Sequence, residues 1–148
     1  MHKSPITKWA LASLFATSAF QAGARDCMPA MQEGWVRLPP MAMPMMAGFG
    51  RITNPCPMPV LIVSASSAAF ADVSIHETRN IGGVNRMREV EALRIAPDDA
   101  VNLKPGGLHL MLMQPRAPLK EGSRIVVSFK LQDGRELLSE LVVRKPAP

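Results

Sequence analysis

Short runs of alternating apolar and polar residues, separated by proline, glycine and asparagine, fill the chain after residue 30. No segment there shows a convincing helical repeat, whereas a period of two is typical of β-strands that are buried on one face. Many short strands at this spacing predict an all-β domain, a sandwich or a barrel. The expected strands are 35–38, 48–53, 60–63, 71–78, 84–95, 100–103, 108–113, 123–131 and 136–143.

The first 24 residues have a different composition. Residues 1–8 carry two lysines and no acid, residues 9–20 are apolar or small, and the segment ends in Ala22-Gly23-Ala24. This order predicts a secretory signal peptide over residues 1–24, cleaved after Ala24 or alternatively after Ala19. Its apolar run is shorter than the roughly 20 residues that a membrane span requires. We therefore expect a single β-sandwich domain over residues 25–148, located in the periplasm.

The charge of the chain excludes one class of partner. Removing the predicted signal peptide, with Lys3 and Lys8, lowers the formal net charge from +5 to +3. The remaining basic residues are scattered and form no run of five, so we expect no nucleic-acid binding. We also expect no membrane span and a monomeric protein.

Two cysteines, Cys27 and Cys56, remain after export. In an oxidising compartment such a pair usually forms a disulfide. In the chain-entropy model, a disulfide that closes a loop of about 30 residues stabilises the folded state by roughly 3–4 kcal/mol. The alternative is that Cys56-Pro57-Met58 is a soft-metal site.

Histidine and methionine carry the candidate chemistry. Leucines alternate with His109, Met111 and Met113 through residues 108–113, so His109 and Met111 project from one strand face about 7 Å apart. His76 lies on the polar face of its own expected strand. Met87 follows the Gly82-Gly83 turn, and a hairpin there would bring it close to His76.

These four side chains form a soft, neutral ligand set. Thioether sulfur selects copper(I), whereas zinc prefers thiolate, imidazole or carboxylate, and calcium and magnesium prefer oxygen. Taken one by one, each residue could also be structural, since a methionine in a strand usually packs in a core. For the set as a whole both interpretations remain open, and as a metal site it would hold one copper(I) ion per chain.

A second group of methionines lies in Pro39-Pro40-Met41-Ala42-Met43-Pro44-Met45-Met46. The prolines predict a loop whose side chains cannot all be buried by a repeating pattern. We expect this loop to lie near the His/Met site and to act in copper capture or partner docking. The alternative is that it only caps one end of the sandwich.

The four residues stand in the order H-x10-M-x21-H-x-M, and this spacing resembles that of the periplasmic copper chaperones called PCuAC. Flanking residues are similar too, above all 103–113 followed by 118–122. The resemblance covers residues 34–143 and implies a cupredoxin-like Greek-key β-sandwich with a copper(I) site at His76, Met87, His109 and Met111. It also implies delivery of copper toward the copper centre of respiratory cytochrome oxidase, with an oxidase subunit or a Sco-type protein as the accepting partner.

Three other functions are compatible with parts of this pattern to different degrees. A periplasmic storage or resistance protein would bind several copper ions per chain, and the Met41–Met46 cluster would add capacity. A redox copper protein would need a cysteine thiolate ligand, and neither cysteine lies near the His/Met pairs in sequence. After removal of the predicted signal peptide, which contains His2, only His76 and His109 remain. Neither histidine lies in the nucleophile and base motif that a hydrolase would need. We therefore expect a binding protein and not an enzyme.

Overall fold

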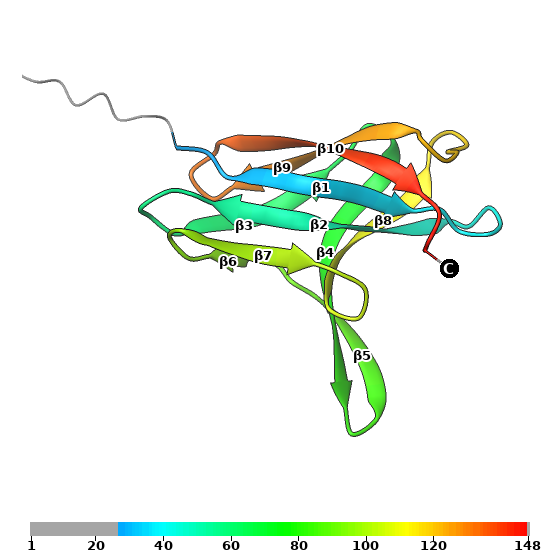
Figure 1. Cartoon of the computed structure of the whole chain (residues 1–148), viewed down its shortest axis with the longest axis horizontal. Helices are drawn as coiled ribbons and strands as arrows, with labels where there is room; N and C mark the ends of the chain where they lie inside the picture. Colours follow the sequence, from blue (N-terminus) through cyan, green and yellow to red (C-terminus); the bar gives the residue numbers. More distant parts are fainter. Residues whose placement is uncertain (1–26, 148) are drawn as a thin grey trace, which may run out of the picture.

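The computed structural model describes residues 27–147, which form ten β-strands and no helix (Figure 1). The all-β prediction is confirmed. The predicted signal peptide lies outside the described residues. None of the described residues belongs to a helix that could cross a membrane. The strands are β1 (Ala30–Arg37), β2 (Met45–Asn54), β3 (Val60–Ser66), β4 (Phe70–Ile81), β5 (Val84–Glu89), β6 (Leu93–Ile95), β7 (Asp99–Leu103), β8 (Leu108–Pro115), β9 (Arg124–Leu131) and β10 (Glu136–Arg144).

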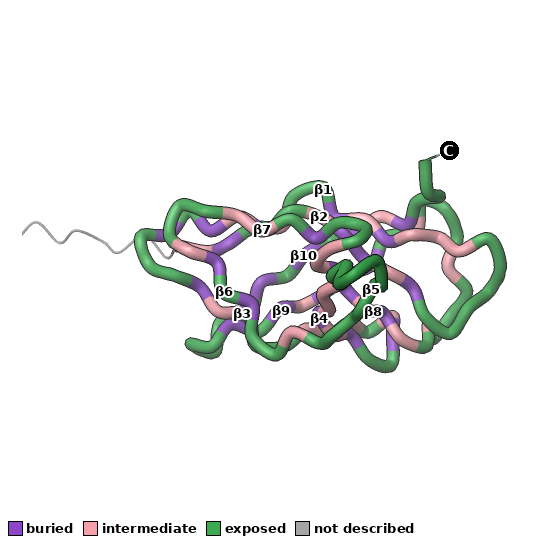
Figure 2. The backbone as a smooth tube through the Cα atoms, turned by 90° about the horizontal axis from the view of Figure 1, so that it is seen from below, coloured by how far each residue is buried: buried purple, intermediate pink, exposed green. Residues whose placement is uncertain are grey.

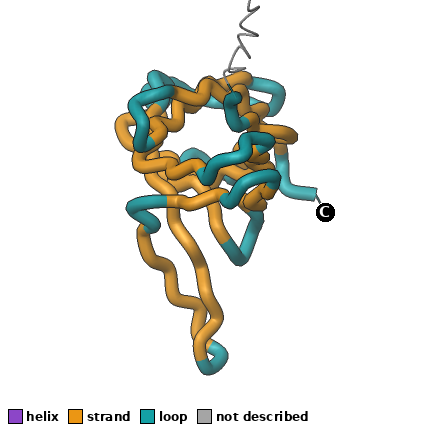
Figure 3. The backbone as a smooth tube through the Cα atoms, turned by 90° about the vertical axis from the view of Figure 1, so that its left-hand side faces the viewer, coloured by secondary structure: helices purple, strands orange, loops and turns teal. Residues whose placement is uncertain are grey.

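The strands close into a flattened barrel. The order β4-β8-β2-β1-β10-β9-β3 is completed by a pairing of β3 with β4, where Ala65 lies opposite Val73. Strands β1 and β10 are parallel, and the other pairs of the ring are antiparallel. Figure 3 shows this ring end-on, with one hairpin extending away from it. The two faces of the expected sandwich are thus continuous with each other at β3 and β4.

The core fills the inside of the ring. Every second residue of the barrel strands points inward, and the fully buried side chains include Phe70, Phe129, Leu110 and Leu112. Each such apolar side chain contributes about 1.5–3 kcal/mol when it leaves water. The alternation that predicted the strands therefore also fixes which side chains face outward. A shift of one residue would move every apolar side chain of a strand from the core to the solvent.

Strand β8 lies at the centre of one barrel wall, between β2 and β4. Its close approach to β2 depends on Gly48, which pairs with Leu110. A Cβ atom at position 48 would lie 3.2 Å from the Cβ of Leu110, so the neighbouring atoms would have to shift by a few tenths of an ångström to admit it. The wall that carries His109 is thus closely packed from behind.

The second half of β4 leaves the barrel and forms a hairpin with β5 (Figures 1 and 3), which we call the arm (residues 77–88). Gly82 and Gly83 turn the chain with φ values of 60° and 83°, which glycine adopts without strain. The Asn80 side-chain oxygen accepts a hydrogen bond from the Gly83 N–H at 3.1 Å. Figure 2 shows most of the arm as exposed, whereas strands of the barrel behind it alternate between buried and exposed positions.

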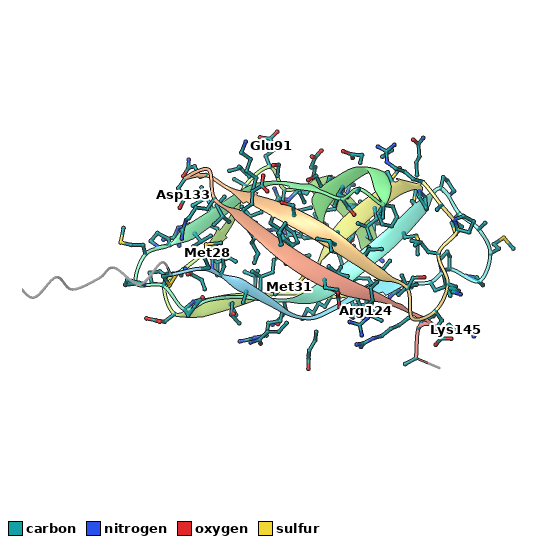
Figure 4. The ribbon with its side chains drawn as sticks, turned by 90° about the horizontal axis from the view of Figure 1, so that it is seen from above. Met28, Met31, Glu91, Arg124, Asp133 and Lys145 are labelled. Atoms are coloured by element: carbon teal, nitrogen blue, oxygen red, sulfur yellow. A yellow bond between two sulfur atoms is a disulfide. The ribbon has the colours of Figure 1, made fainter. Side chains whose placement is uncertain are left out.

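The predicted disulfide is present. Cys27 and Cys56 are bonded, with their Cα atoms 5.5 Å apart, and the bond joins the chain before β1 to the β2–β3 connection. This arrangement leaves no free thiol among the described residues, so the alternative metal site at Cys56-Pro57-Met58 has no thiolate. Met28 and Lys145 lie at opposite ends of the barrel (Figure 4).

Two strands begin at least three residues earlier than predicted. Strand β1 begins at Ala30 and not at residue 35. Strand β2 begins at Met45 and not at residue 48, so Met45 and Met46 belong to a strand and not to a loop. Pro44 immediately precedes the strand, where its missing N–H removes no rung of the ladder. Met46 is only 6% exposed and packs in the core, which explains why the strand extends this far.

Candidate metal centre

His76 and His109 lie directly opposite each other on the neighbouring strands β4 and β8. Their ring centroids are 6.1 Å apart and the ring planes are tilted by 36°. Residues on either side of them in the strands, such as Ile75 and Leu110, point into the core. Both imidazoles therefore project from the outer face of the barrel wall.

The two methionines occupy the diagonal positions next to His76. Met111 lies opposite Ser74, two residues before His76, and Met87 lies opposite Thr78, two residues after it. Side chains of paired residues share a face, and diagonal neighbours are about 7–8 Å apart at the backbone, within reach of long side chains. All four predicted residues thus lie on one face with His76 at the centre.

Exposure changes steeply across this cluster. His109 is 7% exposed and Met87 is 55% exposed, while His76 and Met111 are half-buried. One side of the cluster is the packed barrel wall, and the other side is the arm. The cluster is consequently open to solvent and to other proteins at Met87.

The tautomer of His109 is set by the backbone. Its Nδ1 lies 2.9 Å from the carbonyl oxygen of Gly107, which can only accept a hydrogen bond, so Nδ1 carries the proton. The same oxygen accepts a hydrogen bond from the Thr78 N–H at 3.0 Å, which holds it in place. The lone pair of His109 therefore lies on Nε2, the usual arrangement in a histidine that ligates a metal.

His76 has one satisfied and one unsatisfied nitrogen. Nε2 lies 3.0 Å from the Ser74 hydroxyl, whereas Nδ1 is buried and has no hydrogen-bond partner. A buried polar atom without a partner costs about 1–3 kcal/mol. A metal ion that accepts the lone pair of an imidazole nitrogen would remove this cost, so the donor set fits a bound cation. Ser74 belongs to no motif that would have singled it out in the sequence.

Charged groups lie mainly on the opposite face of the arm. Glu77 forms ion pairs with Arg79 and Arg88, each at 2.9 Å. The hydrogen bonds that Arg79 and Arg88 donate hold the pKa of the Glu77 carboxyl below its usual value. On the His/Met face, Glu89 pairs with His76 and is exposed, and it is a nearby carboxylate that the sequence did not single out.

The side chains of this cluster suit a soft cation better than a hard one. Among residues 27–147, no three or more His, Cys, Asp or Glu side chains are grouped to hold a metal ion. The thioethers of Met87 and Met111 are the side chains at the two diagonals of His76 on this face. Thioether and imidazole ligands favour copper(I) over zinc, calcium and magnesium.

An apolar cavity of about 640 Å³ lies away from this cluster, at one end of the barrel. The β1–β2 loop and the segment after β8 form its walls, which include Met41, Met43, Met46 and Leu119. Met41 and Met43 are exposed loop residues, whereas Met45 is outside this lining. The expected methionine loop thus divides between the cavity and the strand that adjoins the His/Met cluster.

Known proteins resemble this chain in sequence. Residues 30–143 match the family model LpqE-like, described as "Putative lipoprotein LpqE-like". The chain is 33% identical over 105 residues to "Putative lipoprotein Lxx21020" of Leifsonia xyli subsp. xyli (strain CTCB07), covering 70% of this chain and 62% of the relative. It is 31% identical over 88 residues to "Uncharacterized protein RP573" of Rickettsia prowazekii (strain Madrid E), covering 59% and 49%. The chain thus spans 62% and 49% of the lengths of these two relatives.

Solved structures share the fold. The solution structure of CuI-DR1885 from Deinococcus radiodurans matches with a TM-score of 0.67 at 29% identity, covering 86% of this chain and 85% of that one. The apo PCuAC domain from PmoF1 matches with a TM-score of 0.67 at 17% identity, covering 82% and 98%. The fold is therefore that of PCuAC domains, as the sequence resemblance implied, and the family match over residues 30–143 shows that the chain is a member of the LpqE-like family.

Proposed function

We propose that the protein binds one copper(I) ion through His76, Met87, His109 and Met111 and carries it to an accepting protein in the periplasm. One observation carries the proposal: His76 lies opposite His109, with Met87 and Met111 at its two diagonals on the same outer face. The 29% identical relative was solved as CuI-DR1885, which supports copper(I) as the ion.

The ligand set suits a carrier because it holds copper without a thiolate. Both cysteines are bonded to each other, so all the proposed ligands are neutral. The barrel wall fixes His109 and Met111, while Met87 is exposed on the arm. An incoming ligand from an acceptor can replace the Met87 thioether first, and the ion then leaves along the open side. We propose that the acceptor is a copper-site protein of respiratory cytochrome oxidase assembly, such as an oxidase subunit or a Sco-type protein.

Copper(I) titration of the exported protein under reducing, anaerobic conditions tests the proposal, with a competing chelator to measure affinity. We expect one tight copper(I) per chain, and we expect His109→Ala and Met111→Ala to remove the tight binding while the fold is retained. Met58→Leu is the matched control, because Met58 is 69% exposed and lies outside the cluster. Equal affinities for His109→Ala and Met58→Leu would refute the assignment.

Stoichiometry and transfer separate carriage from storage. Several equally tight copper ions per chain would favour a storage protein. Mixing the loaded protein with a purified candidate acceptor, separating the two and measuring copper in each tests delivery. We expect copper to appear on a true acceptor and not on a control protein that lacks a copper site.

A further inference from the structure

A methionine pair adjoins the His/Met cluster on the same barrel wall. Met45, the first residue of β2, lies opposite Met113 of β8. The next pair along these strands, Met46 and Leu112, points into the core with exposed fractions of 6% and 0%. Met45 and Met113 must therefore point outward, because successive residues of a strand face opposite sides.

The backbone around this pair is held in place. The Gln114 N–H donates a hydrogen bond to the Pro44 carbonyl oxygen at 2.6 Å, just beyond the pair. On its other edge β8 pairs with β4, where Asp72 lies opposite Met113. Side chains that lie directly opposite across antiparallel strands have Cβ atoms about 4.5–5.5 Å apart. Two thioether sulfurs at this separation can reach one ion between them.

Packing does not account for Met45. Its side chain is 42% exposed and lies on the outer face, whereas the neighbouring Met46 fills the core. The loop methionines Met41 and Met43 line the apolar cavity, and Met45 does not. Met45, on β2, instead lies beside the outward-facing methionines of β8. Met111 of β8 lies opposite Ala47, the second residue after Met45. Met111 is thus a diagonal neighbour of Met45 and belongs to the proposed copper cluster.

We propose that Met45 and Met113 form a second, weaker copper(I) site that passes its ion to the His76/His109 cluster through Met111. The direction of transfer rests on the proposed function above, whereas the existence of the pair site does not. The two proposed ligands of this second site are both thioethers, so it holds copper less tightly than a site that includes two imidazoles. Asp72 forms no ion pair among the described residues, and its carboxylate places negative charge beside Met113.

The transfer step is a ligand exchange without redox chemistry. The copper ion remains in its +1 state, the Met111 sulfur binds it while the Met45 sulfur leaves, and the imidazole nitrogens then replace Met113. In the tautomer of His109 that donates from Nδ1 to Gly107, the Nε2 lone pair is the one available to the ion. The adjoining methionine sulfurs therefore give copper a path of short steps into the tight site.

The test uses the full mature protein with the tight site disabled. In His76→Ala/His109→Ala, titrated with copper(I) and observed by NMR of isotope-labelled methionine methyl groups, we expect the Met45 and Met113 signals to shift on copper addition. X-ray absorption of this variant should show sulfur and no imidazole scattering. Adding Met45→Leu/Met113→Leu should weaken the remaining binding by about tenfold or more, since both principal ligands are lost. Leucine keeps the volume and apolarity of methionine at both positions.

The matched control is Met41→Leu/Met58→Leu in the same background, because these two methionines are 72% and 69% exposed and do not face each other across a ladder. If this control weakens the binding as much as Met45→Leu/Met113→Leu does, or if neither does, the pair site does not exist. Failure of the proposed function looks different, because wild type would then show no imidazole scattering while the pair-site result could still hold. If the pair binds copper but its replacement leaves the rate of copper uptake by the intact cluster unchanged, the transfer role is refuted.

Discussion

The barrel wall and the arm hold the two halves of the proposed copper site in contrasting ways. Strand β8, which carries His109 and Met111, is paired along both edges, with β2 and β4. Strand β5, which carries Met87, is paired only with β4 among the described strands, and all six of its residues are exposed. The contrast indicates that the wall provides stability and ligand geometry, while the arm provides access. A carrier that must take up and release its ion needs both.

The largest expected difference between the two regions is in stability. Leu110→Ala should destabilise the fold by about 2–5 kcal/mol, because Leu110 is fully buried behind His109 and its truncation leaves a cavity. Val84→Ala at the tip of the arm should change stability by less than about 0.5 kcal/mol, because Val84 is 56% exposed. Urea unfolding of the metal-free protein measures both. Similar losses for the two variants would mean that the arm is part of the cooperative core.

The next difference concerns copper affinity. His109→Ala should lower copper(I) affinity by about 100-fold or more, because it removes a proposed ligand whose tautomer and position are fixed by Gly107. Met87→Ala should have a smaller effect, about tenfold, because an exposed thioether on the arm loses more conformational freedom when it binds. Chelator competition at constant pH measures the ratio. A greater loss for Met87→Ala would show that the arm, and not the wall, dominates binding.

The smallest expected effect is on the charged face of the arm. Glu77 is paired with Arg79 and Arg88, and its lowered pKa means that the pairing stabilises the arm above the ordinary carboxyl value of 4.5. This contribution should be lost as the pH falls through the lowered pKa of Glu77. Glu77→Gln should remove that pH dependence and leave copper affinity at neutral pH nearly unchanged, since Glu77 lies on the opposite face from His76. NMR shifts of arm amides during an acid titration follow the effect.

Local patterns in the sequence predicted much of this architecture. Alternation in residues 108–113 placed His109 and Met111 on one face, and Gly82-Gly83 predicted the turn that brings Met87 near His76. Asp133-Gly134, a typical hairpin turn pair, lies between the expected strands 123–131 and 136–143, and Gly134 has a φ of 91° in the β9–β10 hairpin. Each of these features depends on residues that are close together in the chain.

Features that depend on distant pairing were not predictable in the same way. The direct opposition of His76 and His109 requires the register of β4 against β8, and the Met45–Met113 pair requires that of β2 against β8. Such registers are set by how buried side chains from remote segments pack together. The same reason explains the misplaced start of β2, because only the core position of Met46 shows that the strand reaches past Gly48.

X-ray absorption at the copper edge of the exported protein, loaded with less than one equivalent of copper(I), tests the central claim most directly. The account predicts a shell of two nitrogen atoms with imidazole scattering and two sulfur atoms at thioether distances. In His109→Ala, the nitrogen contribution should fall while the disulfide between Cys27 and Cys56 stays intact. An all-oxygen shell, a thiolate shell, or a spectrum that His109→Ala leaves unchanged would contradict the assignment of copper to the His76/His109 face.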